Sequence, residues 1–500
     1  MILQIKEISI FSEIFLSISI IFLTLHGVFL SYNKFNKFLL LQNSILSLAV
    51  LILVMSSFLI FNEHLFILDY LSFNYSISND YLSFLTKILI GVITIFFLLI
   101  IEQYLLDQKI NHFEYILIIL YSVLGLFLLC SANDLITAYL AIELQSLSFY
   151  LLAAFKKNST FSIEAGLKYF ILGAFSSGLF LFGASIVYGV VGSINFDDFK
   201  DLFFWLSPGN KFEFLQTNLL QFGLTFILIS LFFKLALVPF HLWAPDVYEK
   251  SPTSSSFFFA VVPKIAIFVL LLRICYYSFF GFIDCWRYYI IIISFLSVLV
   301  GSFAGLEQRK LKSLMAYSSI SHMGYLLISF STGSIEGIQM LFNYIIIYMI
   351  SGFCIWGIFI LTRLKNNYSK KGNKDLGDLT LLKKSNKILA FVFSLTLFSV
   401  AGLPPMVGFF VKFGVFLSAI EASMYFVALF NILFSVISTF YYIRIIKILY
   451  FEKILVGKLY YPIKTEKFII IFLFFYLFIF LFINPTFLYL ISYKVSLLFF

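Results

Sequence analysis

Long apolar segments follow one another along almost the whole chain. A helix needs about 20 apolar residues to cross the hydrocarbon core of a bilayer. Only 12% of the 500 residues are charged, against about 25% in a typical soluble domain. The sequence therefore predicts an all-α integral membrane protein with about fourteen transmembrane helices, covering residues 9–31, 37–61, 83–104, 114–130, 132–155, 166–193, 216–243, 254–278, 286–305, 311–331, 337–363, 388–415, 420–448 and 466–493.

The loops between these segments alternate in charge. Loops after even-numbered spans are poor in basic residues and include acidic positions at 79–80, 197–198 and 284. By the positive-inside rule, the basic loops face the cytoplasm or matrix, and an even number of spans puts both termini on the opposite side. Topology thus explains the net charge of +9, and we expect no nucleic-acid partner. The loops after odd-numbered spans carry Lys34 and Lys37, Lys109, Lys156 and Lys157, Lys250, Arg309, Lys310 and Lys312, and the runs 363–387 and 447–467. The longest of them, 363–387, is either a solvated topological loop or a docking segment.

No cofactor or metal site is expected in this chain. The cysteines lie far apart, without a CxxC pair or a histidine at ligand spacing. No glycine-rich nucleotide-binding motif is present. The four cysteines are Cys130, Cys275, Cys285 and Cys354.

The residue usage points to an organelle or a reduced bacterium. The chain contains 68 Phe and 30 Tyr, a preference that an AT-rich genome would produce. The N-terminal segment has no Arg/Ser-rich presequence and no small-residue cleavage site, so we expect the first helix to be retained.

Four ionisable residues lie well inside the predicted spans, namely Glu143, Lys234, Lys264 and Lys412. A lysine at the centre of a bilayer costs about 2.5–3.5 kcal/mol even on the lenient insertion scale. Snorkelling or a buried ion pair that fixes packing could explain any single residue. Four such residues in one chain favour a functional explanation, because the desolvation cost would otherwise be repeated without any gain. A lysine and a carboxylate that shift each other's proton affinity can carry protons.

Two of the charged spans contain helix-breaking residues. Pro239 and Pro245 follow Lys234, and a Gly/Pro run at 402–408 precedes Lys412. Proline removes a backbone donor, so both helices are predicted to be interrupted near their lysines. Interrupted helices in corresponding halves of a chain are typical of transport sites.

The spacing of the charged residues indicates an inverted repeat of five helices, with helices 4–8 matching helices 9–13. The offsets are 412 − 234 = 178, 322 − 143 = 179 and 444 − 264 = 180. The predicted organisation is N-terminal helices in 1–110, a first repeat in 111–278, a second repeat in 286–448 and a C-terminal helix in 449–500.

Three further polar residues are candidates for an auxiliary relay. His322 is either a packing residue or a proton carrier that titrates near neutral pH. His241 and Asp246 follow the break in the seventh span, where capping would explain them equally well.

Five motifs in the sequence are distinctive. They are AYLAIELQSLSFYLLAAF (138–155), EAGLKYFILGAFSSGLFLFG (164–183), PFHLWAPDVYEKSPT (239–253), KLKSLMAYSSISHMGYLL (310–327) and AGLPPMVGFFVKF (401–413). Together they resemble one known family, the antiporter-like subunits of respiratory complex I (NADH:ubiquinone oxidoreductase), which also includes cation/proton antiporters. Within it the pattern is similar to the subunit 2 branch, because Lys412 stands where the subunit 4 branch is expected to have glutamate and Tyr248 where subunits 4 and 5 have histidine. Lys250 and Ser254 depart from the usual glycine and proline, which affects only the loop shape.

The resemblance implies a role for each buried charge. Glu143 and Lys234 would form a coupling pair, Lys264 a central relay and Lys412 a terminal site for proton translocation. NADH, FMN, iron–sulfur clusters and ubiquinone would be used by other subunits. The expected partners are other membrane-arm subunits, including antiporter-like subunit 4, and the lipid bilayer. The expected location is the mitochondrial inner membrane, with the gene in the organelle and both termini on the intermembrane-space side; a bacterial or plastid location is the alternative.

Two other classes of function remain open at this point. A stand-alone antiporter that exchanges sodium or potassium for protons would need the same fold. A structural scaffold with vestigial buried charges would keep the fold without the transport.

Overall fold

The computed structural model describes residues 10–31, 38–66, 70–108, 110, 112–205, 211–365, 370–372, 375–452, 460 and 462–499. Lys34, Lys37 and Lys109, parts of the basic runs 363–387 and 447–467, and both chain ends lie outside the described residues.

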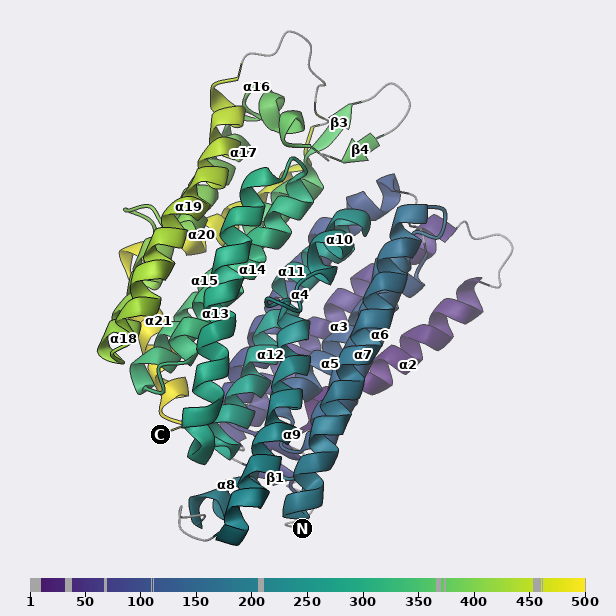
Figure 1. The fold of residues 1–500 in the computed structure, drawn as a ribbon. Coiled ribbons are helices and arrows are strands. Elements are labelled where there is room, and N and C mark those ends of the chain that lie inside the picture. The colour runs from purple at the N-terminus through teal and green to yellow at the C-terminus, as the bar shows by residue number, and fades with distance from the viewer. Residues whose placement is uncertain are drawn as a thin grey trace.

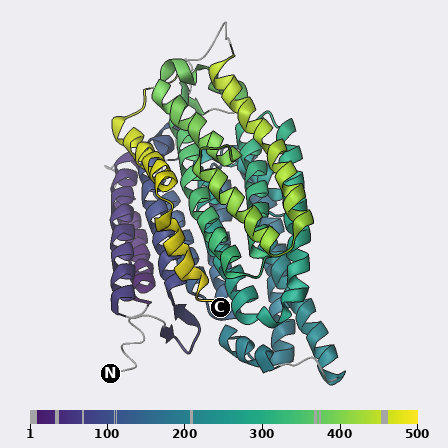
Figure 2. The ribbon, with the colours of Figure 1, turned by 90° about the vertical axis from the view of Figure 1, so that its left-hand side faces the viewer.

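The described chain is a bundle of long helices that run up and down beside one another (Figure 1). Figure 2 shows α2 and α3, in purple, at one edge of the bundle and α20 and α21, in yellow, lying across it. The long helices are α2 (Phe11–Ser31), α3 (Phe38–Phe66), α4 (Tyr81–Asp107), α5 (Glu114–Ser131), α6 (Leu135–Ala154), α7 (Thr160–Val191), α9 (Lys211–Leu235), α13 (Ile283–Glu307), α14 (Leu311–Phe330), α15 (Ile335–Leu361), α17 (Lys387–Ala401), α18 (Val407–Glu421), α19 (Tyr425–Tyr450), α20 (Thr465–Ile483) and α21 (Thr486–Ser496).

Short elements connect the long helices. Strands β1 (Tyr70–Ser72) and β2 (Ile77–Asn79) form an antiparallel hairpin at the lower end of the bundle in Figure 1, and β3 (Arg363–Lys365) and β4 (Lys370–Gly372) form another at the upper end. The remaining elements are α8 (Phe196–Trp205), α10 (Trp243–Lys250), α11 (Thr253–Val261), α12 (Pro263–Leu272), the π-helix η2 (Arg273–Ser278), the 3-10 helices η3 (Phe280–Phe282) and η4 (Leu376–Leu381), and α16 (Leu382–Ser385).

Each of the fourteen predicted spans corresponds to one helix or to two or three consecutive helices. Among the described residues, twelve segments are long and apolar enough to cross a membrane. The other two predicted spans correspond to the 20-residue helix α14 and to the pair α17 and α18, of 15 residues each. The prediction of a multi-pass α-helical membrane protein is therefore confirmed.

Both predicted helix breaks are present. Helix α9 ends at Leu235, and residues 236–242 are non-helical before α10 begins. Helix α17 ends at Ala401, and residues 402–406 separate it from α18. Prolines at 239, 404 and 405 lack the backbone N–H that would continue each helix.

A third interruption, which the sequence argument did not predict, separates α11 from α12 at Val262. Pro263 cannot donate to the carbonyl of Phe259 four residues earlier. The Tyr248 hydroxyl supplies that hydrogen bond instead, at 3.3 Å. This segment is the core of the bundle, since its apolar window is completely buried.

The two breaks lie on opposite sides of their lysines along the chain. Lys234 precedes its break and Lys412 follows its own. The breaks begin at residues 236 and 402, which are 402 − 236 = 166 positions apart. The offset of 178 therefore relates the lysines and not the breaks, and the repeat boundaries remain a prediction.

Candidate functional site

Lys264 lies at the start of α12, in the most buried part of the bundle. Its side chain is only 5% exposed. The Nζ atom donates to the hydroxyl of Tyr348 on α15, at 2.8 Å, and that hydroxyl donates to the Ala260 carbonyl at 3.1 Å. No carboxylate pairs with this buried amine within the described residues. Keeping a charge there is costly, which suits a group that gains and loses its proton.

His322, in the middle of α14, is bonded through both ring nitrogens. Nδ1 lies 2.6 Å from the Tyr344 hydroxyl and Nε2 lies 3.1 Å from the Tyr442 hydroxyl. A neutral imidazole has one donor and one acceptor nitrogen, and a hydroxyl can take either role. His322 is therefore held in place in a way that allows either tautomer.

Lys412 lies against the end of the preceding half-helix. The carbonyl of Ala401 has no helical donor, because residue 405 is a proline. The Nζ atom of Lys412 donates to it at 2.9 Å. This places the cation at the negative end of the α17 dipole. Gly402 is required here, since its φ of +83° is left-handed and a Cβ would lie 2.7 Å from the Lys412 stem.

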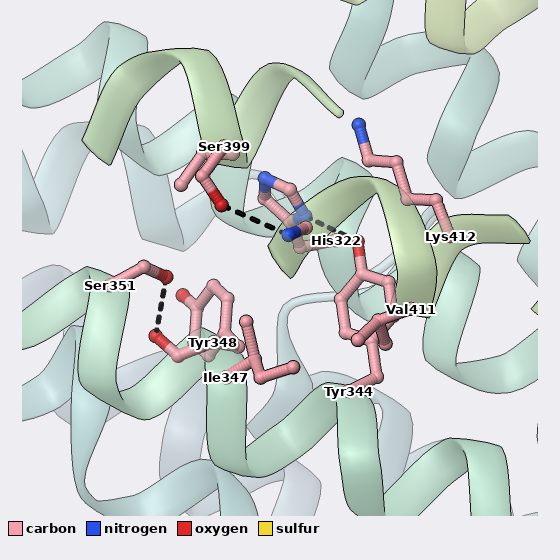
Figure 3. A pocket seen from close by; sticks show the side chains of 10 residues that line it. His322, Tyr344, Ile347, Tyr348, Ser351, Ser399, Val411 and Lys412 are labelled. Carbon is pink, nitrogen blue, oxygen red and sulfur yellow. Dashed lines mark hydrogen bonds between the residues drawn. The ribbon is translucent and has the colours of Figure 1, made fainter. Parts of the chain in front are cut away.

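One small cavity lies between His322 and Lys412 and is also lined by Tyr348, the hydrogen-bond partner of Lys264. His322, Tyr344, Tyr348, Ser351 and Lys412 line a space of about 20 Å³, which is room for about one water molecule. Figure 3 shows the tyrosines of α15 and the imidazole on different sides of this space, with Lys412 at its edge. A second cavity of similar size is lined by His322, Tyr348 and Ser351 among others. Lys412 thus lines this cavity directly, and Lys264 is linked to it by its hydrogen bond to Tyr348.

Glu143 and Lys234 lie in a separate cluster. They form no ion pair within 4.0 Å, although the Lys234 amine is in the electrostatic range of the carboxylate. Two polar side chains of α6 contact these residues. Ser146 Oγ lies 3.4 Å from the Glu143 carboxylate, and the Tyr150 hydroxyl lies 3.5 Å from Lys234 Nζ. Ser146 and Tyr150, one turn apart on α6, are therefore the polar side chains that contact Glu143 and Lys234.

The Tyr150 hydroxyl occupies space that only glycine leaves open. A Cβ at Gly173 on α7 would lie 2.0 Å from this oxygen. The Tyr150 ring packs edge-on against Tyr169, which stacks on Trp243 at 4.5 Å. Trp243 Nε1 in turn donates to the Phe233 carbonyl at 2.9 Å, next to Lys234 at the end of α9. The aromatic residues around the break therefore fix the position of Tyr150 relative to Lys234.

His241 and Asp246 lie apart from the cavity. Asp246 forms an ion pair with Lys168 of α7 at 2.6 Å, and Lys168 also pairs with Glu164 at 3.1 Å. Lys250 completes this partly exposed group by pairing with Glu164. His241 lies in the broken segment, and its carbonyl accepts from the Ala244 amide at 3.0 Å. Structural roles explain these contacts, and a relay role for either residue stays a prediction.

The sequence argument missed the tyrosines that connect the charged residues. Tyr150, Tyr344, Tyr348 and Tyr442 contact the buried lysines and His322. The chain contains 30 tyrosines, so tyrosine content alone does not distinguish these four from the others. Only Ser146 and Tyr150 could have been identified from the sequence, because their helical spacing places them on the same face as Glu143.

Known proteins share both the sequence and the fold. The profile of the family described as NADH:quinone oxidoreductase/Mrp antiporter, TM, matches residues 132–438, more than half of the chain. The chain is 43% identical to NADH-quinone oxidoreductase subunit N of Pelagibacter ubique over 89% of each chain. It is 39% identical to NADH-ubiquinone oxidoreductase chain 2 of Marchantia polymorpha over 98% of each chain.

Solved structures agree with this result. A chain of respiratory complex I from Thermus thermophilus has a TM-score of 0.78 and 26% identity, with 96% of this chain and 98% of that chain covered. A chain of the Mrp complex from Dietzia has a TM-score of 0.77 at 17% identity, with 98% and 97% covered, which shows a shared fold alone. The buried charged residues of this chain therefore lie in a fold that it shares with these membrane subunits. The chain therefore belongs to the antiporter-like membrane subunits of respiratory complex I, in the family of NADH-quinone oxidoreductase subunit N and NADH-ubiquinone oxidoreductase chain 2.

Proposed function

We propose that this subunit carries protons across the membrane through Glu143, Lys234, Lys264, His322 and Lys412. The observation that carries the proposal is a cavity lined by His322, Lys412 and Tyr348, with Lys264 hydrogen-bonded to Tyr348. The three basic side chains are each no more than 6% exposed. A proton on Lys264 can pass through the Tyr348 hydroxyl and a water in the cavity to His322 or Lys412. Glu143, acting through Ser146 and Tyr150, changes the electrostatic field at Lys234 and so its proton affinity.

The energy for this transport comes, in this proposal, from NADH oxidation by ubiquinone in other subunits, which hold FMN and iron–sulfur clusters. Moving one charge against 100 mV costs about 2.3 kcal/mol. A continuous open pore would dissipate that energy, so the site must alternate its access to the two faces. The small size of the cavity, about 20 Å³, supports a gated route over an open pore.

The setting follows from the family and from the charges of the loops. We place the subunit in the mitochondrial inner membrane next to antiporter-like subunit 4, with both termini on the intermembrane-space side. Both described ends lie in the lower part of the bundle in Figure 1, away from the β3–β4 loop, which supports this orientation. The helices of 111–278 and 286–448 would act as the two half-channels, with 1–110 and 449–500 flanking them.

Lys234→Ala tests the coupling pair. The substitution removes the amine that Glu143 acts on, so we expect fewer protons translocated per NADH oxidised by the intact complex in proteoliposomes. Lys157→Ala, at an exposed position of the α6–α7 loop, is the control and should pump normally. Pumping per electron equal to that of the wild type in Lys234→Ala would rule out this role.

Gly173→Ala tests the tyrosine connection without touching a charge. The new methyl group displaces the Tyr150 hydroxyl from Lys234. A hydrogen bond to a charged group is worth about 1.5–3 kcal/mol, so we expect proton flux through this subunit to fall about tenfold. Gly178→Ala, in the same helix with no atom within 4 Å of the added Cβ, is the matched control. Equal proton fluxes in the two variants would contradict the role of Tyr150.

A further inference from the structure

A second group of buried charges lies in the first three long helices, outside residues 132–438 that match the family profile. Glu13 is in the first turn of α2, Glu63 in the last turn of α3 and Lys87 in the second turn of α4. Their side chains are 3%, 8% and 2% exposed. These three helix ends meet beside the β1–β2 hairpin, and the α2–α3 pair forms one edge of the bundle (Figure 2).

The three side chains are in direct contact with one another or with Ser12. Lys87 forms an ion pair with Glu13, and its Nζ atom also donates to Asn79 Oδ1 at 3.3 Å. The Ser12 amide donates to Glu63 Oε1 at 2.7 Å. The Ser12 hydroxyl lies 2.6 Å from Glu13 Oε2 and 3.1 Å from Glu63 Oε2. This hydroxyl therefore bridges the two carboxyl groups.

The hydroxyl bridge requires one additional hydrogen. The Ser12 hydroxyl has a single hydrogen, so it can donate a well-directed hydrogen bond to only one carboxylate. An ionised carboxylate has no hydrogen of its own and can only accept. Two short contacts from one hydroxyl to two carboxyls are satisfied when one carboxyl carries a proton and donates it to Ser12. Ser12 then donates to the other carboxylate.

The charge balance of the group independently indicates one bound proton. Two carboxylates and one ammonium leave one negative charge uncompensated in a buried place, which is costly. Asp80 adds no further negative charge, because Arg273 of η2 neutralises it with contacts of 2.7 and 2.9 Å. One bound proton makes the group neutral. The other titratable groups around it are His64 of α3, Tyr81 of α4, Cys130 of α5 and Lys494 of α21, which lies over the Tyr81 ring.

A small cavity lies beside this group. Glu63, His64, Asn79, Asp80 and Lys87 line a space of about 20 Å³, enough for about one water molecule. Because the group lies within two turns of three helix ends, the path from this cavity to the aqueous face is short. A proton can therefore reach Glu63 without crossing the membrane.

We propose that Glu13, Glu63, Ser12 and Lys87 form a proton-binding site that holds one exchangeable proton at the face where the β1–β2 hairpin lies. A hydronium ion in the cavity transfers a proton to the Glu63 carboxylate, an O–H bond forms, and water is left. The Ser12 hydroxyl then donates to Glu13, which stays paired with Lys87. The site stands on its own contacts and does not depend on the route through Lys264.

Infrared difference spectra of the intact purified complex between acidic and alkaline buffer, in H2O and D2O, test this proposal. A protonated carboxyl has a C=O stretching band that shifts in D2O. We expect one band of this kind to be present in the wild-type difference spectrum and absent from the spectra of both Glu63→Gln and Glu13→Gln. Glu102→Gln is the matched control, because Glu102 is on α4 and is balanced by Lys467 at 2.9 Å; this variant should keep the band.

A spectrum unchanged in both Gln variants would overturn the proposal, as would a band lost equally from Glu102→Gln. If the Gln variants do not assemble, Ser12→Ala keeps both carboxyls and removes only the bridging hydroxyl. We then expect the band to shift to another frequency, and an unshifted band overturns the proposal. Lys87→Met gives a further check, because the two carboxyls without their cation should bind a second proton and the band should grow.

Discussion

Replacing Lys264 with methionine is expected to stop proton transfer through this subunit while leaving the complex assembled. A positioned acid–base group typically contributes about 10²–10⁴-fold to the rate of proton transfer, so we expect a fall in proton flux of at least about 10²-fold. Lys264 is 5% exposed and its only described polar partner is the Tyr348 hydroxyl, which keeps the Ala260 carbonyl as its own acceptor. Methionine fills the same space without a buried charge, so stability should not fall.

The measurement is the number of protons translocated per NADH oxidised by the intact complex in proteoliposomes. Lys384→Met, at an exposed position of α16, is the control and should behave as the wild type. An unchanged proton count in Lys264→Met, with normal assembly, would show that the buried lysine is not on the route. Loss of assembly in Lys264→Met would instead point to a scaffold role.

The largest loss of stability is expected from Arg273→Met. The guanidinium group of Arg273 donates to both Asp80 oxygens, to Ser78 Oγ at 2.7 Å and to the Cys130 carbonyl at 3.2 Å. Removing one partner of a fully buried ion pair costs about 3–5 kcal/mol, because the other charge stays unpaired. The Asp80 side chain is 22% exposed, so we expect a loss near the lower end of this range. We expect less assembled complex and a lower temperature of thermal unfolding.

The double variant Arg273→Met, Asp80→Asn separates the ion pair from the packing. Asparagine keeps the helix cap that Asp80 forms at α4, where Asp80 accepts from the Ser83 amide at 2.9 Å. With both charges removed, stability should recover most of the loss. If the double variant is as unstable as Arg273→Met, the cost lies in packing of the Arg273 side chain and not in an unpaired carboxylate.

Local chemistry explains why so much of this fold could be predicted from the sequence. A run of about 20 apolar residues forms a membrane helix whatever surrounds it, because its backbone must satisfy its own hydrogen bonds in lipid. Prolines 239 and 405 remove donors wherever they stand, so both breaks were predictable. Lys234, Lys264 and Lys412 are conspicuous because a lysine inside such a run is rare and costly.

The residues near helix ends gave no such signal. Glu13, Glu63 and Lys87 lie within two turns of a helix end, where a charged side chain ordinarily reaches water by snorkelling. They are buried only because three helix ends meet and cover them. Hydropathy along the chain carries no information about which ends meet, so the sequence could not predict this group.

The connections between charges likewise depend on contacts between distant helices. Tyr348 is 84 residues from Lys264, and Tyr442 is 120 residues from His322. Glu143 and Lys234, expected as a pair, instead contact Ser146 and Tyr150 respectively, and Gly173 leaves room for the tyrosine hydroxyl. Helix formation, helix breaks and the cost of a buried charge are properties of short segments, so the sequence sufficed for them. Which side chains share a proton depends on distances of about 3 Å between segments far apart in the chain, and those distances exist only in the packed bundle.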